Sequence, residues 1–271
     1  MRAHELGANT FQIFSASPRM WRAAVPDPAG IAAMRRVRER LDLSPLVIHD
    51  NYLINLASID PVIRARSIAA FRGELERAAA IGAEYLVAHP GSYRNQSVED
   101  GVRNFTRGVD EAWRGLRTGA LMLLVEGTAG SGCAIGSRLE ELAAIRGLID
   151  RPVGFCLDTC HLLAAGYDVA SAAGLGRTLD EASRILGFEH IRLIHANDSK
   201  APLASRVDRH ANIGEGHIGM DGFRRILGHP NLRRLPFILE TPVASEGDDR
   251  RNLETLKELC RKSRTITTPS S

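Results

Sequence analysis

Short apolar runs rich in β-branched residues alternate with stretches of helical periodicity along this chain of 271 residues. Between the runs, residues 61–80 carry apolar side chains at helical spacing before Gly82, which predicts a helix that stops at this glycine. Alternation of strand and helix is typical of βα units that build a parallel sheet. Seven runs, each bounded by Pro, Gly, Asn or Ser, predict strands at residues 10–14, 46–49, 85–89, 121–126, 153–158, 191–195 and 237–240.

This pattern predicts an α/β fold, a (β/α)8 TIM barrel that lacks its first strand in this chain. A closed barrel needs eight strands, and the sequence shows seven, with Arg2 to Gly7 patterned like the end of a helix. Because proteins avoid unpaired strand edges, we expect the first strand to lie upstream of Met1. We expect one barrel domain over residues 1–262 and a flexible tail over 263–271, with Arg261 to Ser271 reading as a polar, frayed end.

Six of the seven predicted strands end in a side chain that can bind a metal. The segments are VIHD, VAHP, LVEG, CLDTCH, LIHAND and ILET. In a barrel the carboxyl ends of the strands meet on one face, so residues scattered along the sequence are expected to converge there. The polar loop after the sixth strand adds Asp208 and His210, two residues apart and able to chelate one ion together.

The candidate ligands combine neutral imidazoles with carboxylates, the donors that hold zinc or manganese. Nine ligands exceed the four that one zinc ion takes, so two or three ions are implied, and a carboxylate could bridge two of them. A lone strand-end histidine is more often a hydrogen-bonded neighbour than a ligand, and a lone aspartate often caps a helix; the coincidence of so many favours a metal site. The nine are His49, His89, Glu126, Asp158, His161, His195, Asp208, His210 and Glu240.

Composition changes this picture little. The apolar fraction of 44% and the net charge of +3 fit an ordinary globular protein and permit a polyanionic partner without requiring one. Cys156 and Cys160 are expected to be reduced, buried thiols, with a ligand role as the less favoured alternative. With no apolar run long enough for a membrane span and no signal peptide at the start, we expect a cytoplasmic protein without membrane contact.

Several motifs together resemble the endonuclease IV family, zinc-dependent apurinic/apyrimidinic endonucleases built on a xylose-isomerase-like barrel. The resemblance runs in order from about Gly7 to Pro242, and DTCH and RVDRH are its most specific parts. The matching segments are HDNYLINLAS, AHPGS, VEGTAG, LDTCHLLAAGYD, HANDSK, SRVDRHANIGEGHIG and ILET.

The resemblance implies three zinc ions per chain, with manganese as an alternative metal, and assigns the nine ligands among them. One ion would be held by His49, His89 and Glu126; a second by Glu126, Asp158, His195 and Glu240, with Glu126 as the bridge; and the third by His161, Asp208 and His210. The ligands of the first two ions form the implied catalytic set. The implied DNA-binding residues are Arg19, Tyr52, Leu53, Arg206 and Arg209.

The expected function is therefore DNA repair. The enzyme would hydrolyse the phosphodiester 5′ to an abasic site in duplex DNA, leaving a 3′-hydroxyl and a 5′ deoxyribose phosphate, and we expect it to act as a monomer. Two alternatives stay open at this point: a divalent-metal sugar isomerase or epimerase on the same barrel, and an inactive DNA-binding relative of the family.

Overall fold

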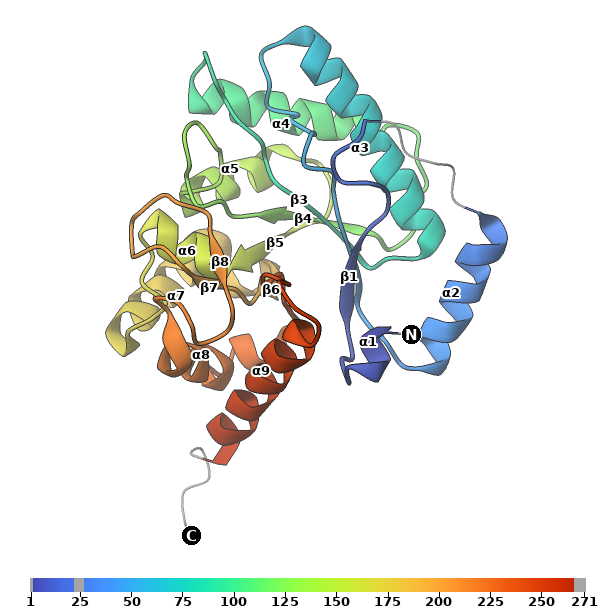
Figure 1. Cartoon of the computed structure of the whole chain (residues 1–271). Helices are drawn as coiled ribbons and strands as arrows, with labels where there is room; N and C mark the ends of the chain where they lie inside the picture. Colours follow the sequence, from blue (N-terminus) through green and yellow to red (C-terminus); the bar gives the residue numbers. More distant parts are fainter. Residues whose placement is uncertain (1, 22–26, 266–271) are drawn as a thin grey trace. The chain divides into compact units, whose positions relative to one another are not determined.

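A computed structural model describes residues 2–21 and 27–265 of the chain (Figure 1). Seven parallel strands, the number that the sequence predicts, form one sheet in the order β1-β2-β3-β4-β5-β6-β9. These strands are β1 (Phe11–Phe14), β2 (Leu46–His49), β3 (Tyr85–Ala88), β4 (Met122–Glu126), β5 (Val153–Asp158), β6 (Ile191–His195) and β9 (Phe237–Ile238). A separate antiparallel pair consists of β7 (Asp198–Ser199) and β8 (His210–Ala211).

The helices follow the strands along the chain. They are α1 (Arg2–Glu5), α2 (Pro28–Arg40), α3 (Pro61–Ile81), α4 (Val98–Trp113), α5 (Leu139–Leu148), α6 (Thr159–Ala165), α7 (Ala172–Leu186), α8 (Gly219–Gly228) and α9 (Asp248–Thr265), with short 3-10 turns at Phe188–His190 and Leu232–Arg234. Among the described residues, no helix combines the length and the apolar character needed to cross a bilayer.

The chain forms two compact units. The first comprises Met1–Glu126, Cys133–Gly136 and Glu140–Phe155, and the second comprises Gly127–Gly132, Ser137–Leu139 and Cys156–Ser271. In the first unit β1 to β4 pair in parallel, with Phe14 aligned to His49 and Val87 to Leu124. In the second unit β6 pairs with β9, with His195 aligned to Ile238.

Helix α3 shows how local sequence sets an element of the first unit. Asp60 caps its start by accepting the backbone N–H groups of Val62 and Ile63, and Gly82 ends it in the left-handed conformation at φ 79°. Phe71 lies on its buried face, and α3 packs against α4. Ile63, an apolar residue in the first turn of α3, is 41% exposed.

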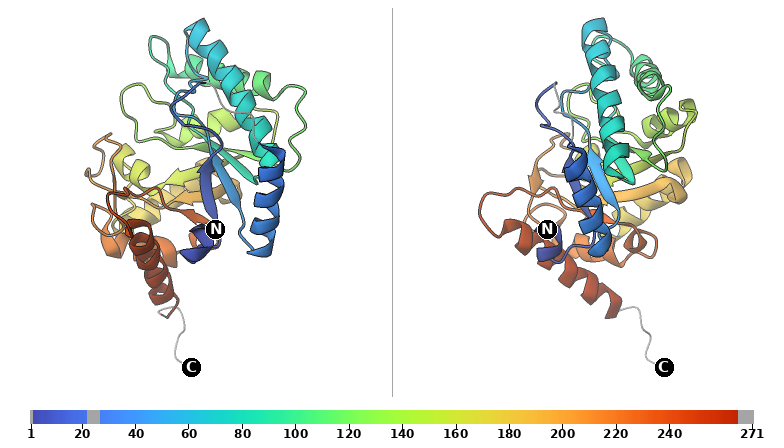
Figure 2. Two further views of the ribbon diagram at one scale, coloured as in Figure 1. Left: turned by 45° about the vertical axis from the view of Figure 1, so that its right-hand side comes forward. Right: turned by 90° about the vertical axis from the view of Figure 1, so that its right-hand side faces the viewer.

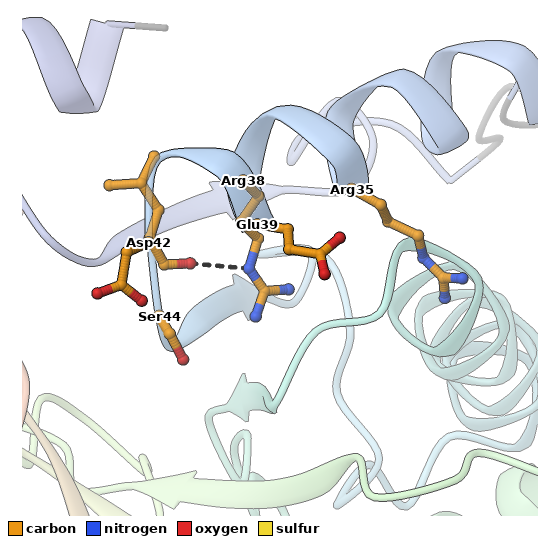
Figure 3. A pocket seen from close by; sticks show the side chains of 6 residues that line it. Arg35, Arg38, Glu39, Asp42 and Ser44 are labelled. Atoms are coloured by element: carbon orange, nitrogen blue, oxygen red, sulfur yellow. Dashed lines mark hydrogen bonds between the residues drawn. The ribbon is translucent and has the colours of Figure 1, made fainter.

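Two arginines of α2 hold the far end of α3, where the last carbonyls lack partners within the helix. Arg35 donates to the carbonyls of Ala79 and Ile81, and Arg38 donates to those of Leu43 and Gly82. Figure 3 labels both arginines and draws the bond from Arg38 to Leu43 as a dashed line. Both views of Figure 2 show α2 beside this end of α3. Both arginines also line a hollow of about 290 Å³. Because their side chains are used in bonds to backbone carbonyls, we assign this hollow a structural role.

The predicted ends of several elements differ from the observed ones by one or two residues, as is usual where pairing stops. The C-terminal prediction was wrong in part: α9 continues to Thr265, so residues 261–265 are helical. Helix α9 packs against α8, and Leu256 and Leu259 of α9 are buried, so packing stabilises a helix whose polar last residues suggested a frayed tail. The rest of the predicted tail, 266–271, lies outside the described residues.

Candidate metal centres

Three candidate ligands meet at the strand ends of the first unit. His49 ends β2, His89 directly follows β3 and Glu126 ends β4. One atom of each lies within 4.8 Å of the others. Glu126 Oε2 is 3.2 Å from Nε2 of His49 and 3.6 Å from Nε2 of His89, and both His49 and Glu126 are buried. The parallel register of neighbouring strands therefore places residues that are 77 positions apart within bonding range of one ion.

His49 presents a defined nitrogen to this cluster. Its Nδ1 lies 3.0 Å from the carbonyl oxygen of Asp50, so Nδ1 carries the proton and donates, while Nε2 keeps its lone pair toward Glu126. Burial raises the pKa of the Asp50 carboxyl well above its usual value; His49 opposes this shift, whereas Glu74 and Glu126 add to it.

A second group lies in the other unit, again at strand ends. Asp158 ends β5, His195 ends β6 and Glu240 follows β9 by two residues. Each offers one atom within 4.8 Å of the others, and His195 Nδ1 is 3.1 Å from Glu240 Oε2. Asp158 and His195 have no exposed surface, so both are held by the packing around them.

The third group lies in the same unit and joins a helix to a loop. His161 lies in the first turn of α6, and Asp208 and His210 come from the loop that enters β8. Asp208 places Oδ2 3.4 Å from His161 Nε2 and Oδ1 3.4 Å from His210 Nε2. Nε2 of His210 is buried without a hydrogen bond and also lies 3.6 Å from an oxygen of Asp158.

The donor atoms in these groups fit divalent metal ions. Around a tetrahedral zinc ion with ligands at about 2.0–2.2 Å, neighbouring ligand atoms are roughly 3.4 Å apart, and the contacts above span 3.1 to 3.6 Å. His161 and His210, like His49, have Nδ1 near a backbone carbonyl, 2.9 Å from that of Gly127 and 3.1 Å from that of Glu240. Each ring therefore donates through Nδ1 and directs the lone pair of Nε2 at its carboxylate partners.

The loop after β6 is shaped by a buried carboxylate that the sequence analysis did not single out. Asp198 has no exposed surface and accepts five backbone N–H groups. Its Oδ2 accepts from Gly214, Gly216 and Gly219 at 3.0 to 3.1 Å, and its Oδ1 accepts from Ser199 and Ile218 at 2.8 and 2.9 Å. The only sequence signal is the glycine-rich segment that follows, whose close backbone approach needs residues without side chains. The Asp198 carboxylate thereby holds β7 and β8 in place, and His210 with them.

Asn51, which the sequence did not indicate as a functional residue, connects the loops of the first unit that carry the expected DNA-binding residues. This buried side chain donates to the carbonyls of Ser17 and Met20, 3.1 and 2.6 Å away, on either side of Arg19. Its Oδ1 accepts the N–H of Leu53 at 2.8 Å. Arg19 is exposed, and the ring of Tyr52, 59% exposed, rests edge-on against Phe14 with centroids 5.2 Å apart.

Arg206 and Arg209, the expected DNA-binding residues of the second unit, are both exposed in the loop before β8. Arg206 has a left-handed backbone with φ 56°, an unfavourable conformation for a residue with a side chain. Its N–H donates to Ala164 at 2.9 Å, and its carbonyl accepts the hydroxyl of Ser131 at 2.6 Å. These bonds hold the strained residue, which is the pattern found at functional loops.

The remaining metal-competent residues behave as predicted or lie apart from the groups above. Cys156 and Cys160 are free, buried thiols. Burial, with the Asp158 carboxylate beside it, raises the pKa of Cys160 to about 11; its thiol is therefore protonated at neutral pH, although Sγ lies within 4.8 Å of Asp158 and His210. Among the described residues, none of the metal-competent groups includes His4, His190, His217 or His229.

Comparison with known proteins decides the family. A family model described as xylose isomerase-like TIM barrel matches residues 1–262. A probable endonuclease 4 from Solibacter usitatus is 62% identical over 263 residues, which cover 96% of this chain and 91% of the relative. The chain belongs to the endonuclease IV family.

Other members agree with this assignment. An endonuclease 4 from Thermus thermophilus is 44% identical over 255 residues, covering 94% of this chain and 90% of the relative. A crystal structure of endonuclease IV from the same species matches with a TM-score of 0.86 and 42% identity, over 96% of this chain and 92% of that one. The predicted TIM-barrel fold is thereby confirmed. A D-tagatose 3-epimerase-like protein, at 19% identity and a TM-score of 0.75, shares the fold alone.

Proposed function

We propose that this chain is a metal-dependent DNA-repair endonuclease that hydrolyses the phosphodiester 5′ to an abasic site in duplex DNA. Membership of the endonuclease IV family supports the reaction class. The observation that carries the proposal is the set of imidazoles with Nδ1 on a backbone carbonyl and Nε2 3.2 to 3.6 Å from a carboxylate oxygen, which suits divalent cations.

The proposed cofactor is three zinc ions per chain. The first would be held by His49, His89 and Glu126, the second by Glu126, Asp158, His195 and Glu240, and the third by His161, Asp208 and His210. A carboxylate has two oxygens and can bind one ion with each, which makes Glu126 suited to bridge. Bound divalent cations would supply Lewis-acid chemistry: they activate water near neutral pH and stabilise the departing oxygen.

The protein's own residues would contribute position and charge. Water adds to phosphorus while the bond to the 3′ oxygen breaks, which leaves a 3′-hydroxyl and a 5′ deoxyribose phosphate. No side chain needs to form a covalent bond. Arg19, Arg206 and Arg209 would contact phosphates, and the exposed ring of Tyr52 with Leu53 would fill the space of the missing base. Displacing a baseless nucleotide costs less stacking energy than displacing a paired one, which would give selectivity for the lesion.

A sugar isomerase or epimerase is not favoured. The solved structures with sugar-epimerase names are 13 to 19% identical to this chain and show only the fold. The group of His161, Asp208 and His210 would add a further cation site beyond the one or two ions that such chemistry uses. That cation would neutralise charge on a phosphodiester.

The test is a nicking assay on a duplex with a single abasic site, with metal content measured on the same preparation. We expect incision with about three zinc ions per chain, loss of incision after chelation, and recovery with added zinc. Glu126→Gln should abolish incision, whereas Glu99→Gln, an exposed carboxylate of α4, should retain it. Full incision by Glu126→Gln would refute the assigned role of this residue, and turnover of a ketose without incision would refute the function.

A further inference from the structure

Asn197 lies between the candidate ligands of the second unit without being one of them. It follows His195 by two residues and has no exposed surface. Its Nδ2 donates to Asp158 Oδ2 at 2.5 Å, and its Oδ1 accepts the backbone N–H of Glu240 at 2.8 Å. One amide thus contacts candidate ligand residues at the ends of two other strands, 39 and 43 positions away in the sequence.

The backbone of Asn197 is also held in place. The hydroxyl of Thr159, the first residue of α6, donates to the carbonyl oxygen of Asn197 at 2.7 Å and accepts its N–H at 3.0 Å. Because Asn197 is bonded through both backbone groups and both ends of its amide, it has little freedom to reorient. A residue held in this way can impose its position on the groups that it contacts.

The hydrogen bond from Asn197 fixes the orientation of the Asp158 carboxylate. Oδ1 accepts the N–H of His161 at 2.9 Å in the cap of α6, and Oδ2 accepts the amide of Asn197. Each oxygen is therefore oriented by its own donor, and each keeps lone-pair capacity for a cation. Without the amide, only the bond between Oδ1 and the N–H of His161 would orient the carboxylate, and Oδ2 could rotate away from its present position.

The choice of an amide has a chemical reason. The position needs a donor toward a carboxylate and an acceptor toward a backbone N–H, and an amide has one at each end. A carboxylate would place an acceptor against Asp158 and repel it, and an alkyl group would leave the N–H of Glu240 buried without a partner.

We propose that Asn197 is a positioning residue that sets the geometry of Asp158 and Glu240, and so the affinity for the ion that these two would hold with His195. This inference rests on the metal-dependent function proposed above. Residues that orient metal ligands typically change metal affinity by about 10- to 100-fold when they are removed. The effect is expected at this one ion and not at the ion held by His49 and His89.

The experiment is a cobalt titration of metal-depleted protein, followed by visible absorption, with Asn197→Ala compared with wild type and with Asn104→Ala. Asn104 is a suitable control because its amide also donates to a side chain, Gln96 at 2.9 Å, on α4 away from any candidate ligand. We expect Asn197→Ala to bind one of three ions about 10- to 100-fold more weakly, with the others unchanged. Incision should recover at raised zinc, with KM for DNA unaffected.

Thr159→Val provides a second variant, since it releases the backbone of Asn197 but keeps the amide, and it should weaken the same ion to a smaller extent. Folding is checked for each variant by circular dichroism. A folded Asn197→Ala with wild-type affinity at every ion would overturn the inference; should it not fold, an unchanged titration of Thr159→Val would do so. If wild-type protein binds no cobalt, the proposed function fails instead, and the two failures are distinguishable.

Discussion

Replacing Asp198 with asparagine should destabilise the second unit far more than an ordinary loss of surface charge. Asparagine keeps the shape of the side chain and one oxygen acceptor but replaces the other oxygen with an NH2 donor. In the better orientation the amide oxygen still accepts from Gly214, Gly216 and Gly219, and the NH2 group faces the N–H groups of Ser199 and Ile218, which lose their acceptor. Each buried N–H left without an acceptor costs about 1 kcal/mol or more, so the two together cost roughly 2 kcal/mol. For a chain of this size that lowers Tm by roughly 4–8 °C.

The assay is urea unfolding followed by far-ultraviolet circular dichroism, with Asp221→Asn as the control. Asp221 is an exposed carboxylate of α8 whose partner is Arg224, and its substitution should leave the urea midpoint within the error of wild type. Asp198→Asn should also weaken the ion proposed for His210, because β7 and β8 pair with Ser199 opposite His210. An Asp198→Asn midpoint equal to that of the control would refute the reasoning, since it would mean that the N–H groups find other acceptors.

Three further predictions concern the DNA-binding loops and acid stability. Asn51→Ala should raise Kd for an uncleavable abasic duplex by about 10-fold with metal content unchanged, because the lost bonds hold the loop of Arg19 and each is worth about 1 kcal/mol; a change below twofold in fluorescence anisotropy would count against it. Arg209→Ala should reduce the slope of log K against log salt by about one, and an unchanged slope would remove this residue from the phosphate contacts. The hydroxyl of Ser245 and nearby N–H groups lower the pKa of Asp248 to about 2 from 3.8, so its contribution to stability is present above pH 3.8 and is lost as pH falls toward 2. The urea midpoints of chelated wild type and Asp248→Asn should thus differ at pH 6 and converge near pH 2, and a constant gap would contradict the assignment.

Local sequence was enough to predict the elements and the candidate ligands. An apolar run that ends in His49 or Glu126 is visible within ten residues, because a strand has a short period and its end is marked by the first polar residue. The motifs then connected these positions to a family, and the observed strands β2, β4, β5 and β6 end at the residues expected.

Other features depended on contacts that no local pattern encodes. The amide of Asn197 meets Asp158 across 39 positions, and Asn51 meets Ser17 across 34, through bonds that exist only once the strands are side by side. The nitrogen that His161 or His210 offers is likewise decided by a backbone carbonyl from a distant segment, that of Gly127 or of Glu240. Sequence by itself therefore determined which residues could bind metal, because side-chain chemistry and strand ends are local properties. Tertiary structure alone decided how those residues are aimed, because orientation is set by hydrogen bonds between segments distant along the chain.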